Sequence, residues 1–196
     1  MPHADLSHYI RVYDDGLDPD TCDALVNVFE SRRRFQQPNG RGIRAGLEAS
    51  AWIELNLSRV ADPELLFAFR GRVDRALARY NADVSLTIAI PPTARTSDLV
   101  FKRYRPGADE AFQLHFDAIN HVANRYLVLI WYLNDVERGG ETRFPQLDLA
   151  VAARRGRLLM FPPYWMYQHE GVAPESGDKN ILSTYLLFDT TLSAPS

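Results

Sequence analysis

Two hydrophobic periodicities divide the chain. In the N-terminal part, apolar residues recur at helical spacing, which predicts amphipathic helices at about residues 19–35 and from residue 63 onward. Asp62 would be the N-cap of the second helix and Pro63 its first residue. The positions expected to face the core are Cys22, Leu25, Val28 and Phe29 in the first helix and Leu66, Phe69, Val73 and Leu77 in the second.

The C-terminal part shows short apolar runs separated by turn residues, which predict strands. We expect strands at residues 86–89, 98–104, 113–117, 125–134, 141–144, 149–152, 157–161, 166–170 and 180–189, and two earlier ones at residues 8–13 and 51–57. Many short strands with polar turns are typical of a sandwich or jelly roll. The sequence therefore predicts a mainly β fold with flanking α.

Length and composition favour one domain over residues 1–196, in which residues 1–90 support a core formed by residues 91–190. The single cysteine excludes an internal disulfide, and no apolar secretory core follows Met1, so a cytoplasmic protein is expected. No apolar run is long enough to cross a membrane. The net charge of -3 argues weakly against a nucleic-acid partner.

Three side chains suggest a metal site. Alternate residues of a strand point to the same face, so His115 and Asp117 would project together. His169 follows far along the chain, and the double-stranded β-helix (a jelly-roll, cupin-like fold) is the architecture whose open end can gather all three residues. Two imidazoles and one carboxylate leave coordination positions open, which suits non-haem Fe(II). We therefore predict this fold, with the N-terminal helices packed outside the sheet.

A lysine opens the last apolar strand. Lys179, Ile181, Ser183 and Tyr185 would share one face of it. An ammonium removed from water needs an anionic partner, and the natural candidate is the distal carboxylate of 2-oxoglutarate.

The chain resembles the 2-oxoglutarate and Fe(II) dependent dioxygenases, and among them the prolyl 4-hydroxylase type catalytic domain. The resemblance rests on YRPG at 104–107, His115-x-Asp117, YLNDV at 132–136, GGETRFP at 139–145, GRLLMF at 156–161, His169-x-Gly171 and Lys179. His-x-Asp alone is a weak signal, but the same triplet followed by these segments in order is a strong one.

The resemblance implies roles for single residues. His115, Asp117 and His169 would be the catalytic iron ligands, and Lys179 would pair with the distal carboxylate of the cosubstrate. Tyr104 and Thr142 match positions that hydrogen-bond the same carboxylate. Tyr185 falls where the family often has a tryptophan lining that pocket, and Ser183 is a hydroxyl neighbour on the same strand face.

The implied reaction hydroxylates an sp3 carbon of an amino-acid or peptidyl substrate with dioxygen, while 2-oxoglutarate is decarboxylated to succinate and ascorbate serves as reductant. Two alternatives stay open: a cupin-like metal-dependent lyase, isomerase or hydrolase, and a non-catalytic binding module that kept the fold. The arginine-rich segment 32–46 is either a solvated loop or a lid that grips an anion.

Overall fold

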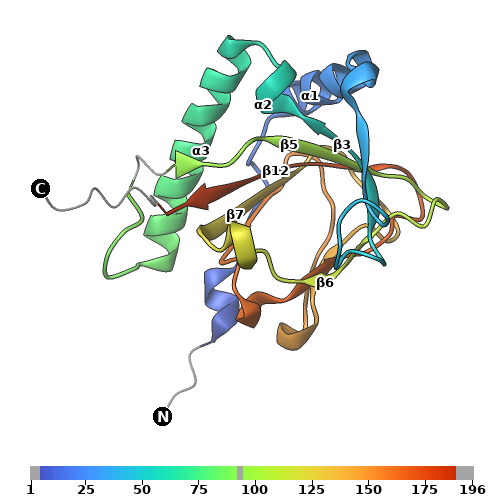
Figure 1. Cartoon of the computed structure of the whole chain (residues 1–196). Helices are drawn as coiled ribbons and strands as arrows, with labels where there is room; N and C mark the ends of the chain where they lie inside the picture. The colour runs from blue at the N-terminus through green and yellow to red at the C-terminus, as the bar shows by residue number, and fades with distance from the viewer. Residues whose placement is uncertain (1–4, 92–94, 189–196) are drawn as a thin grey trace, which may run out of the picture.

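Two antiparallel β-sheets face each other in the computed structural model, which describes residues 5–91 and 95–188 (Figure 1). The larger sheet has the spatial order β1 (Arg11–Tyr13), β10 (Leu158–Phe161), β7 (Arg125–Tyr132), β12 (Lys179–Leu187), β5 (Val100–Tyr104), β3 (Ala51–Asn56) and β2 (Gln37–Gly40), and β4 (Arg95–Thr96) pairs with β12. The smaller sheet has the order β6 (Phe112–His115), β11 (His169–Gly171), β8 (Thr142–Phe144) and β9 (Leu149–Val151). This architecture confirms the predicted double-stranded β-helix.

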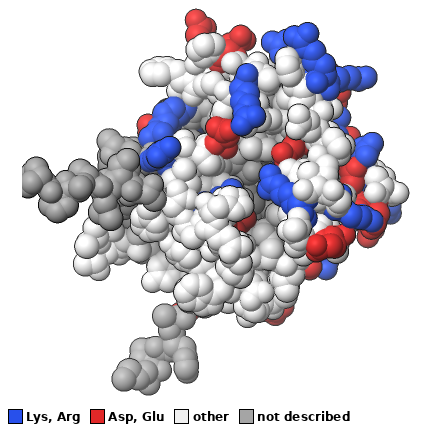
Figure 2. Space-filling view, in the orientation of Figure 1, with Lys and Arg blue, Asp and Glu red and all other residues white. Residues whose placement is uncertain are grey.

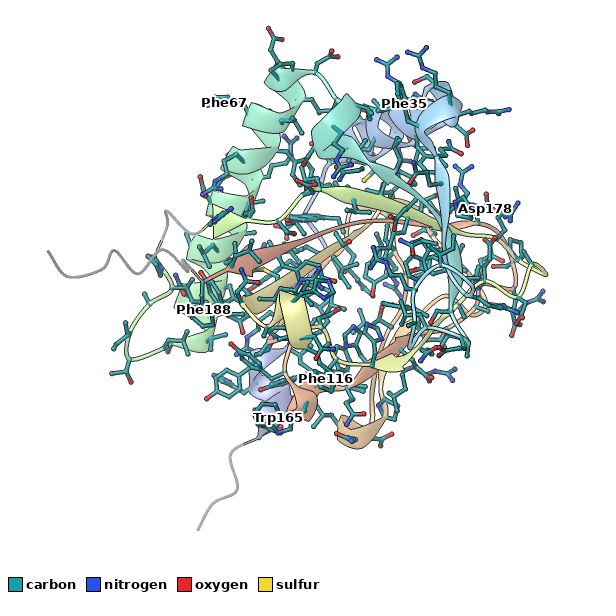
Figure 3. The ribbon with its side chains drawn as sticks, viewed as in Figure 1. Phe35, Phe67, Phe116, Trp165, Asp178 and Phe188 are labelled. Carbon is teal, nitrogen blue, oxygen red and sulfur yellow. The ribbon has the colours of Figure 1, made fainter. Side chains whose placement is uncertain are left out.

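The helices lie outside the larger sheet, on the side away from β6 (Figure 1). They are α1 (Pro19–Ser31), α2 (Leu57–Val60) and α3 (Pro63–Val84). Both long helices begin at a proline behind an aspartate N-cap, and the Asp18 carboxylate accepts a hydrogen bond from the Thr21 N–H at 2.7 Å. Phe67 projects from α3 away from the sheets (Figure 3) and is 83% exposed. No helix in the described ranges 5–91 and 95–188 is long and apolar enough to span a membrane.

The central strands of the larger sheet, β10, β7 and β12, are buried on both faces over most of their length. In β7, Leu127, Leu129 and Trp131 pack with the helices, whereas the alternate residues from Val128 to Tyr132 belong to a second core shared with the smaller sheet. The second core encloses the functional site. Short single-turn 3-10 helices connect the elements at Leu6–Tyr9, Arg33–Phe35, Asn120–Val122, Pro145–Leu147 and Trp165–Tyr167.

The strand expected at residues 86–89 was predicted wrongly. Residues 86–90 follow α3 as irregular chain with a bend at residues 87–88, without a strand partner. The Asn81 side chain replaces that partner, because its amide oxygen accepts from the Ile90 N–H at 3.0 Å and its nitrogen donates to the Ile90 carbonyl at 2.8 Å. Local apolar residues therefore pack on the core without joining a sheet.

Other predicted segments differ in detail. The strand expected at residues 113–117 ends at His115, so Asp117 lies beyond it and does not share a strand face with His115. Residues 8–13 divide between a 3-10 turn and β1, and residues 166–170 divide between a 3-10 turn and β11. The arginine-rich segment 32–46 is not one loop, because its residues Gln37–Gly40 form β2, an edge strand paired with β3. Pro38 is compatible with an edge position, but a proline argues against a strand when only the sequence is known.

Candidate metal centre

Three side chains converge where the smaller sheet meets the chain after β6. His115 ends β6 and is the cross-strand partner of His169, the first residue of β11. Asp117 follows two residues later, and its N–H donates to the Pro163 carbonyl at 3.0 Å. One ligand atom from each of the three side chains lies within 4.8 Å of the others, so the group is able to hold a metal ion.

Hydrogen bonds fix both imidazoles in the orientation that a metal requires. The Nδ1 of His115 lies 2.7 Å from the Gln113 carbonyl, and the Nδ1 of His169 lies 3.1 Å from the Tyr167 carbonyl. A carbonyl only accepts, so each Nδ1 carries the proton and each Nε2 keeps its lone pair. The two Nε2 atoms lie 3.5 and 3.4 Å from the Asp117 carboxylate oxygens.

The polar atoms of this group fit a bound cation. The His115 Nε2 and the Asp117 Oδ2 are buried and have no hydrogen-bond partner, a costly state that a metal ion would relieve. Burial and the neighbouring His115 lower the pKa of His169 to about 3, which keeps this imidazole neutral and able to coordinate. Burial alone would raise the pKa of Asp117, but His115, His169 and Arg125 hold it below its usual value.

A further contact holds the carboxylate. The Tyr185 hydroxyl donates to Asp117 Oδ1 at 3.0 Å, and the Arg125 guanidinium lies over the Tyr185 ring at 3.7 Å. Arg125 Nη1 also donates to the Asp117 carbonyl at 3.3 Å. Tyr185 therefore orients the Asp117 carboxylate and lies at the metal end of the site.

Lys179 lies at the other end, where β12 pairs with β5. It is 2% exposed, and its Nζ lies 5.3 Å from the Tyr104 ring centre and 5.9 Å from that of Tyr132. The Tyr132 hydroxyl donates to Thr142 Oγ1 at 2.6 Å. Among the residues that the structure describes, no carboxylate lies within 4.0 Å of the Lys179 ammonium. Burial lowers the pKa of Lys179 to about 7, and nearby Glu141 opposes that shift only in part.

One cavity between the sheets joins both ends. The eight residues singled out in the sequence all line it: His115, Asp117, His169, Lys179, Tyr104, Thr142, Ser183 and Tyr185. Gly171 leaves room beside the lysine, because a Cβ at this position would lie 3.5 Å from Lys179 Nζ and 3.3 Å from Phe112 Cβ. The cavity is thus polar at its two ends and walled by Ile130 and Ile181 between them.

Sequence reasoning missed Lys102, which lines the same cavity. It lies on β5 two residues before Tyr104, so both side chains face the smaller sheet, whereas Phe101 and Arg103 face the helices. The alternation of side chains along this strand was the available signal, because Lys102 is two residues from Tyr104 and therefore points to the same face. Arg125 was missed as well, since its role depends on contacts with residues distant in sequence.

Comparisons with known proteins agree with this geometry. Residues 99–187 match the family model of the 2OG-Fe(II) oxygenase superfamily. The chain is 24% identical over 173 residues to procollagen-lysine,2-oxoglutarate 5-dioxygenase of Drosophila melanogaster, which covers 84% of this chain and 22% of that protein. The chain thus spans about a fifth of the length of this curated relative.

Solved prolyl hydroxylases have the same fold. The Trichoplax adhaerens enzyme in complex with a hypoxia inducible factor peptide superposes with a TM-score of 0.72 at 16% identity, over 96% of this chain and 89% of that one. The viral collagen prolyl hydroxylase of Paramecium Bursaria Chlorella virus-1, in its 2OG complex, gives a TM-score of 0.63 at 20% identity, over 91% and 95%. These structures show that the chain has the fold of the prolyl hydroxylases, and the segment that matches the 2OG-Fe(II) oxygenase superfamily contains the His115, Asp117 and His169 cluster.

Proposed function

We propose that this chain is an Fe(II) and 2-oxoglutarate dependent hydroxylase that acts on an sp3 carbon of an amino-acid or peptidyl substrate and converts 2-oxoglutarate to succinate. One observation carries the proposal: a two-histidine, one-carboxylate cluster and a buried lysine with no carboxylate partner lie at opposite ends of a single cavity. The first feature suits Fe(II), and the second suits a dicarboxylic acid.

Each residue has a separate task in this reaction. His115, Asp117 and His169 would hold Fe(II) through three protein ligands and leave the remaining positions to the reactants. Lys179 would bind the distal carboxylate of 2-oxoglutarate, with Tyr104, Thr142 and Ser183 around it. Fe(II) with 2-oxoglutarate and dioxygen supplies the oxidant for a C–H bond when bound.

The remaining work of the protein is orientation and exclusion of water. Tyr185 holds the Asp117 carboxylate in place by its hydrogen bond, and the carbonyls of Gln113 and Tyr167 hold the two imidazoles. Ile130 and Ile181 contribute apolar side chains to the lining between the two ends, which lowers the local polarity and strengthens charged contacts there.

The direct test is succinate formation. The purified chain, loaded anaerobically with Fe(II), is given 2-oxoglutarate, dioxygen and ascorbate, and succinate is measured together with oxygen consumption. Candidate amino acids, peptides and lysate are then searched by mass spectrometry for a gain of one oxygen. Wild-type protein that binds Fe(II) but neither binds 2-oxoglutarate nor forms succinate would favour the metal-dependent lyase, isomerase or hydrolase instead.

Several expectations stay predictions. They are the use of ascorbate as reductant, a cytoplasmic location, the absence of a nucleic-acid partner, and the division of the chain into a supporting part at residues 1–90 and a metal-binding core at residues 91–190.

A further inference from the structure

The chain contains only two lysines, Lys102 and Lys179, and both line the cavity described above. The remaining basic side chains that carry a permanent charge are arginines. Lys179 has a task in the proposed function. Lys102 has none, although it lies beside the same metal cluster.

The Lys102 ammonium is held between two aromatic rings. Its Nζ lies 5.4 Å from the ring centre of Trp52 and 5.3 Å from that of Phe112. Phe112 in turn packs against His115, with 3.8 Å between the ring centres and the ring planes tilted by 48°. The rings hold the ammonium beside the metal cluster and away from bulk water, where an anionic partner binds more strongly than at an open surface.

An ion pair would explain a buried ammonium as a structural feature, and among the described residues Lys102 has none. Glu54 is its cross-strand partner in β3, but the Glu54 carboxylate accepts from Trp52 Nε1 at 2.8 Å. Within the described part of the chain, no carboxylate lies within 4.0 Å of Lys102 Nζ. Burial lowers the pKa of Lys102, with the charges of Asp117 and Glu54 opposing the shift.

Lys102 also lines a groove outside the cavity. This groove, about 690 Å³ in volume, shares Lys102, Phe112, Asp117, Ser183 and Tyr185 with the metal cavity. Its lining contains four arginines and two acidic residues in addition to Lys102 and Asp117, and the charges of Arg44 and Arg125 act on Lys102: Arg34, Arg44, Arg59, Arg125, Glu54 and Asp98. Figure 2 shows this face hollowed near its centre, with both basic and acidic side chains around the hollow. Lys102 thus stands at the junction between the groove and the metal cluster.

When Fe(II) and 2-oxoglutarate are bound, the charges at this junction favour binding of a further anion. The two charges of Fe(II) are offset by those of 2-oxoglutarate, and Asp117 and Lys179 offset each other. Lys102, Arg44 and Arg125 then face Glu54 as the nearest remaining carboxylate, which leaves excess positive charge where a substrate enters. Such an excess favours a carboxylate-bearing ligand.

We propose that Lys102 binds the carboxylate of the substrate, with Arg44 and Arg125 in the lining of the groove, and that the substrate is therefore a small molecule with a free carboxylate, most simply a free amino acid. This inference rests on the proposed function and names its substrate class. An internal residue of a peptide has no carboxylate on its main chain to offer to Lys102. Because Lys102 lines both spaces, a carboxylate bound there places the carbons next to it at the metal cluster.

The two lysines permit a binding test that does not depend on turnover. Protein labelled with ¹³C at lysine gives two side-chain signals, which the variants Lys102→Met and Lys179→Met assign. The Zn(II)-loaded protein is titrated first with 2-oxoglutarate and then, at saturation, with the proteinogenic amino acids as free acids and as C-terminal amides. We expect 2-oxoglutarate to shift the Lys179 signal, and at least one free acid to shift the Lys102 signal while its amide binds about tenfold or more weakly.

Turnover of the Fe(II) enzyme supplies the second arm. For the acid identified, Lys102→Met should raise KM by about tenfold or more, and Lys102→Arg should restore part of the loss. The dissociation constant of 2-oxoglutarate should change less than about twofold in Lys102→Met, whereas Lys179→Met should weaken it. Melting curves of all variants exclude loss of folding as the cause.

The outcomes separate the two proposals. If no free acid binds or is oxidised, if acid and amide behave alike, or if a peptide with a blocked C-terminus is the better substrate, the inference about Lys102 is overturned and the hydroxylase assignment stands. If 2-oxoglutarate itself shifts neither lysine signal and yields no succinate, the proposed function fails first.

Discussion

The two lysines of this chain are alike in chemistry and differ in access. Both lie on paired strands of the larger sheet, both approach aromatic rings, and both are free of a carboxylate partner within 4.0 Å among the described residues. Lys179 is closed in at 2% exposure, whereas Lys102 is half-buried and borders an open groove. In the two proposals, access and not residue type separates the cosubstrate site at Lys179 from the substrate site at Lys102.

The roles proposed for both lysines require a bound metal ion, so removing a metal ligand should have the largest effect on activity. We expect Asp117→Ala and His169→Ala to lose bound iron and turnover, because two remaining ligands do not define a site. Iron per chain after anaerobic reconstitution is the measurement. Lys102→Met and Lys179→Met serve as controls and should retain iron. Wild-type loading in either ligand variant would contradict the assignment of the cluster.

The next largest effect should come from Lys179. A charge-assisted bond in a desolvated pocket contributes about 1.5 to 3 kcal/mol, so Lys179→Ala should weaken 2-oxoglutarate binding roughly ten- to a hundredfold. Lys179→Arg should recover part of this, since its planar fork keeps the charge but needs more room. Calorimetric titration of the Fe(II)-loaded protein decides it, with Lys102→Met as the matched control. Equal loss in both lysine variants would erase the distinction between the two sites.

The comparison also shows what the sequence was able to predict. Lys179 stood out because it opens a strand of apolar residues within an ordered run of motifs, and the structure places it in the expected cavity. Lys102 stood between Phe101 and Arg103 on a strand of mixed polarity, and its only signal was that it alternates in step with Tyr104. The pairing of β5 with β12 and β3 places both side chains on the face toward the site.

The same limit explains the errors in the fold. The helices at Pro19–Ser31 and Pro63–Val84 were predictable because their caps and apolar stripes are local signals. The false strand at residues 86–89 and the missed β2 depend on partners outside each segment. The Asn81 side chain takes up the backbone hydrogen bonds of Ile90, and β3 pairs with Gln37–Gly40. Likewise, the hydrogen bond from Tyr185 to Asp117 joins residues far apart in the chain.

The affinity for 2-oxoglutarate should also depend on pH through Lys179, and this effect should be smaller than those above. Lys179 must be charged to bind a carboxylate, and burial lowers its pKa to about 7 in the free protein. Above that pH the free lysine is neutral, so binding takes up a proton, and the affinity for 2-oxoglutarate should fall by up to about tenfold per pH unit above 7.

Calorimetry in buffers of different ionisation enthalpy measures this proton uptake directly. Lys179→Arg provides the control, because a guanidinium stays charged and its affinity should vary little between neutral and mildly alkaline pH. Affinity of the unaltered protein that is constant over the same range would show that the ammonium keeps its proton in the empty pocket.

The smallest effect concerns stability. A buried ammonium without a partner costs free energy, so Lys179→Met, which keeps the length of the side chain, should raise the free energy of unfolding by about 1 kcal/mol or leave it unchanged. The sign with pH follows from the lowered pKa. At or below pH 7 the lysine is charged in both states and the full cost is present.

As pH rises from about 7 toward the ordinary lysine value of 10.5, the folded protein already carries a neutral amine while the unfolded chain still binds a proton, so the cost declines. The advantage of Lys179→Met should therefore be greatest near neutral pH and shrink in alkali, as urea denaturation of the metal-free proteins would measure. Lys102→Met should show a weaker version, since Lys102 is only half-buried. A loss of several kcal/mol in either variant would instead identify that lysine as a structural element of the sheet, and the division into cosubstrate and substrate sites would need another basis.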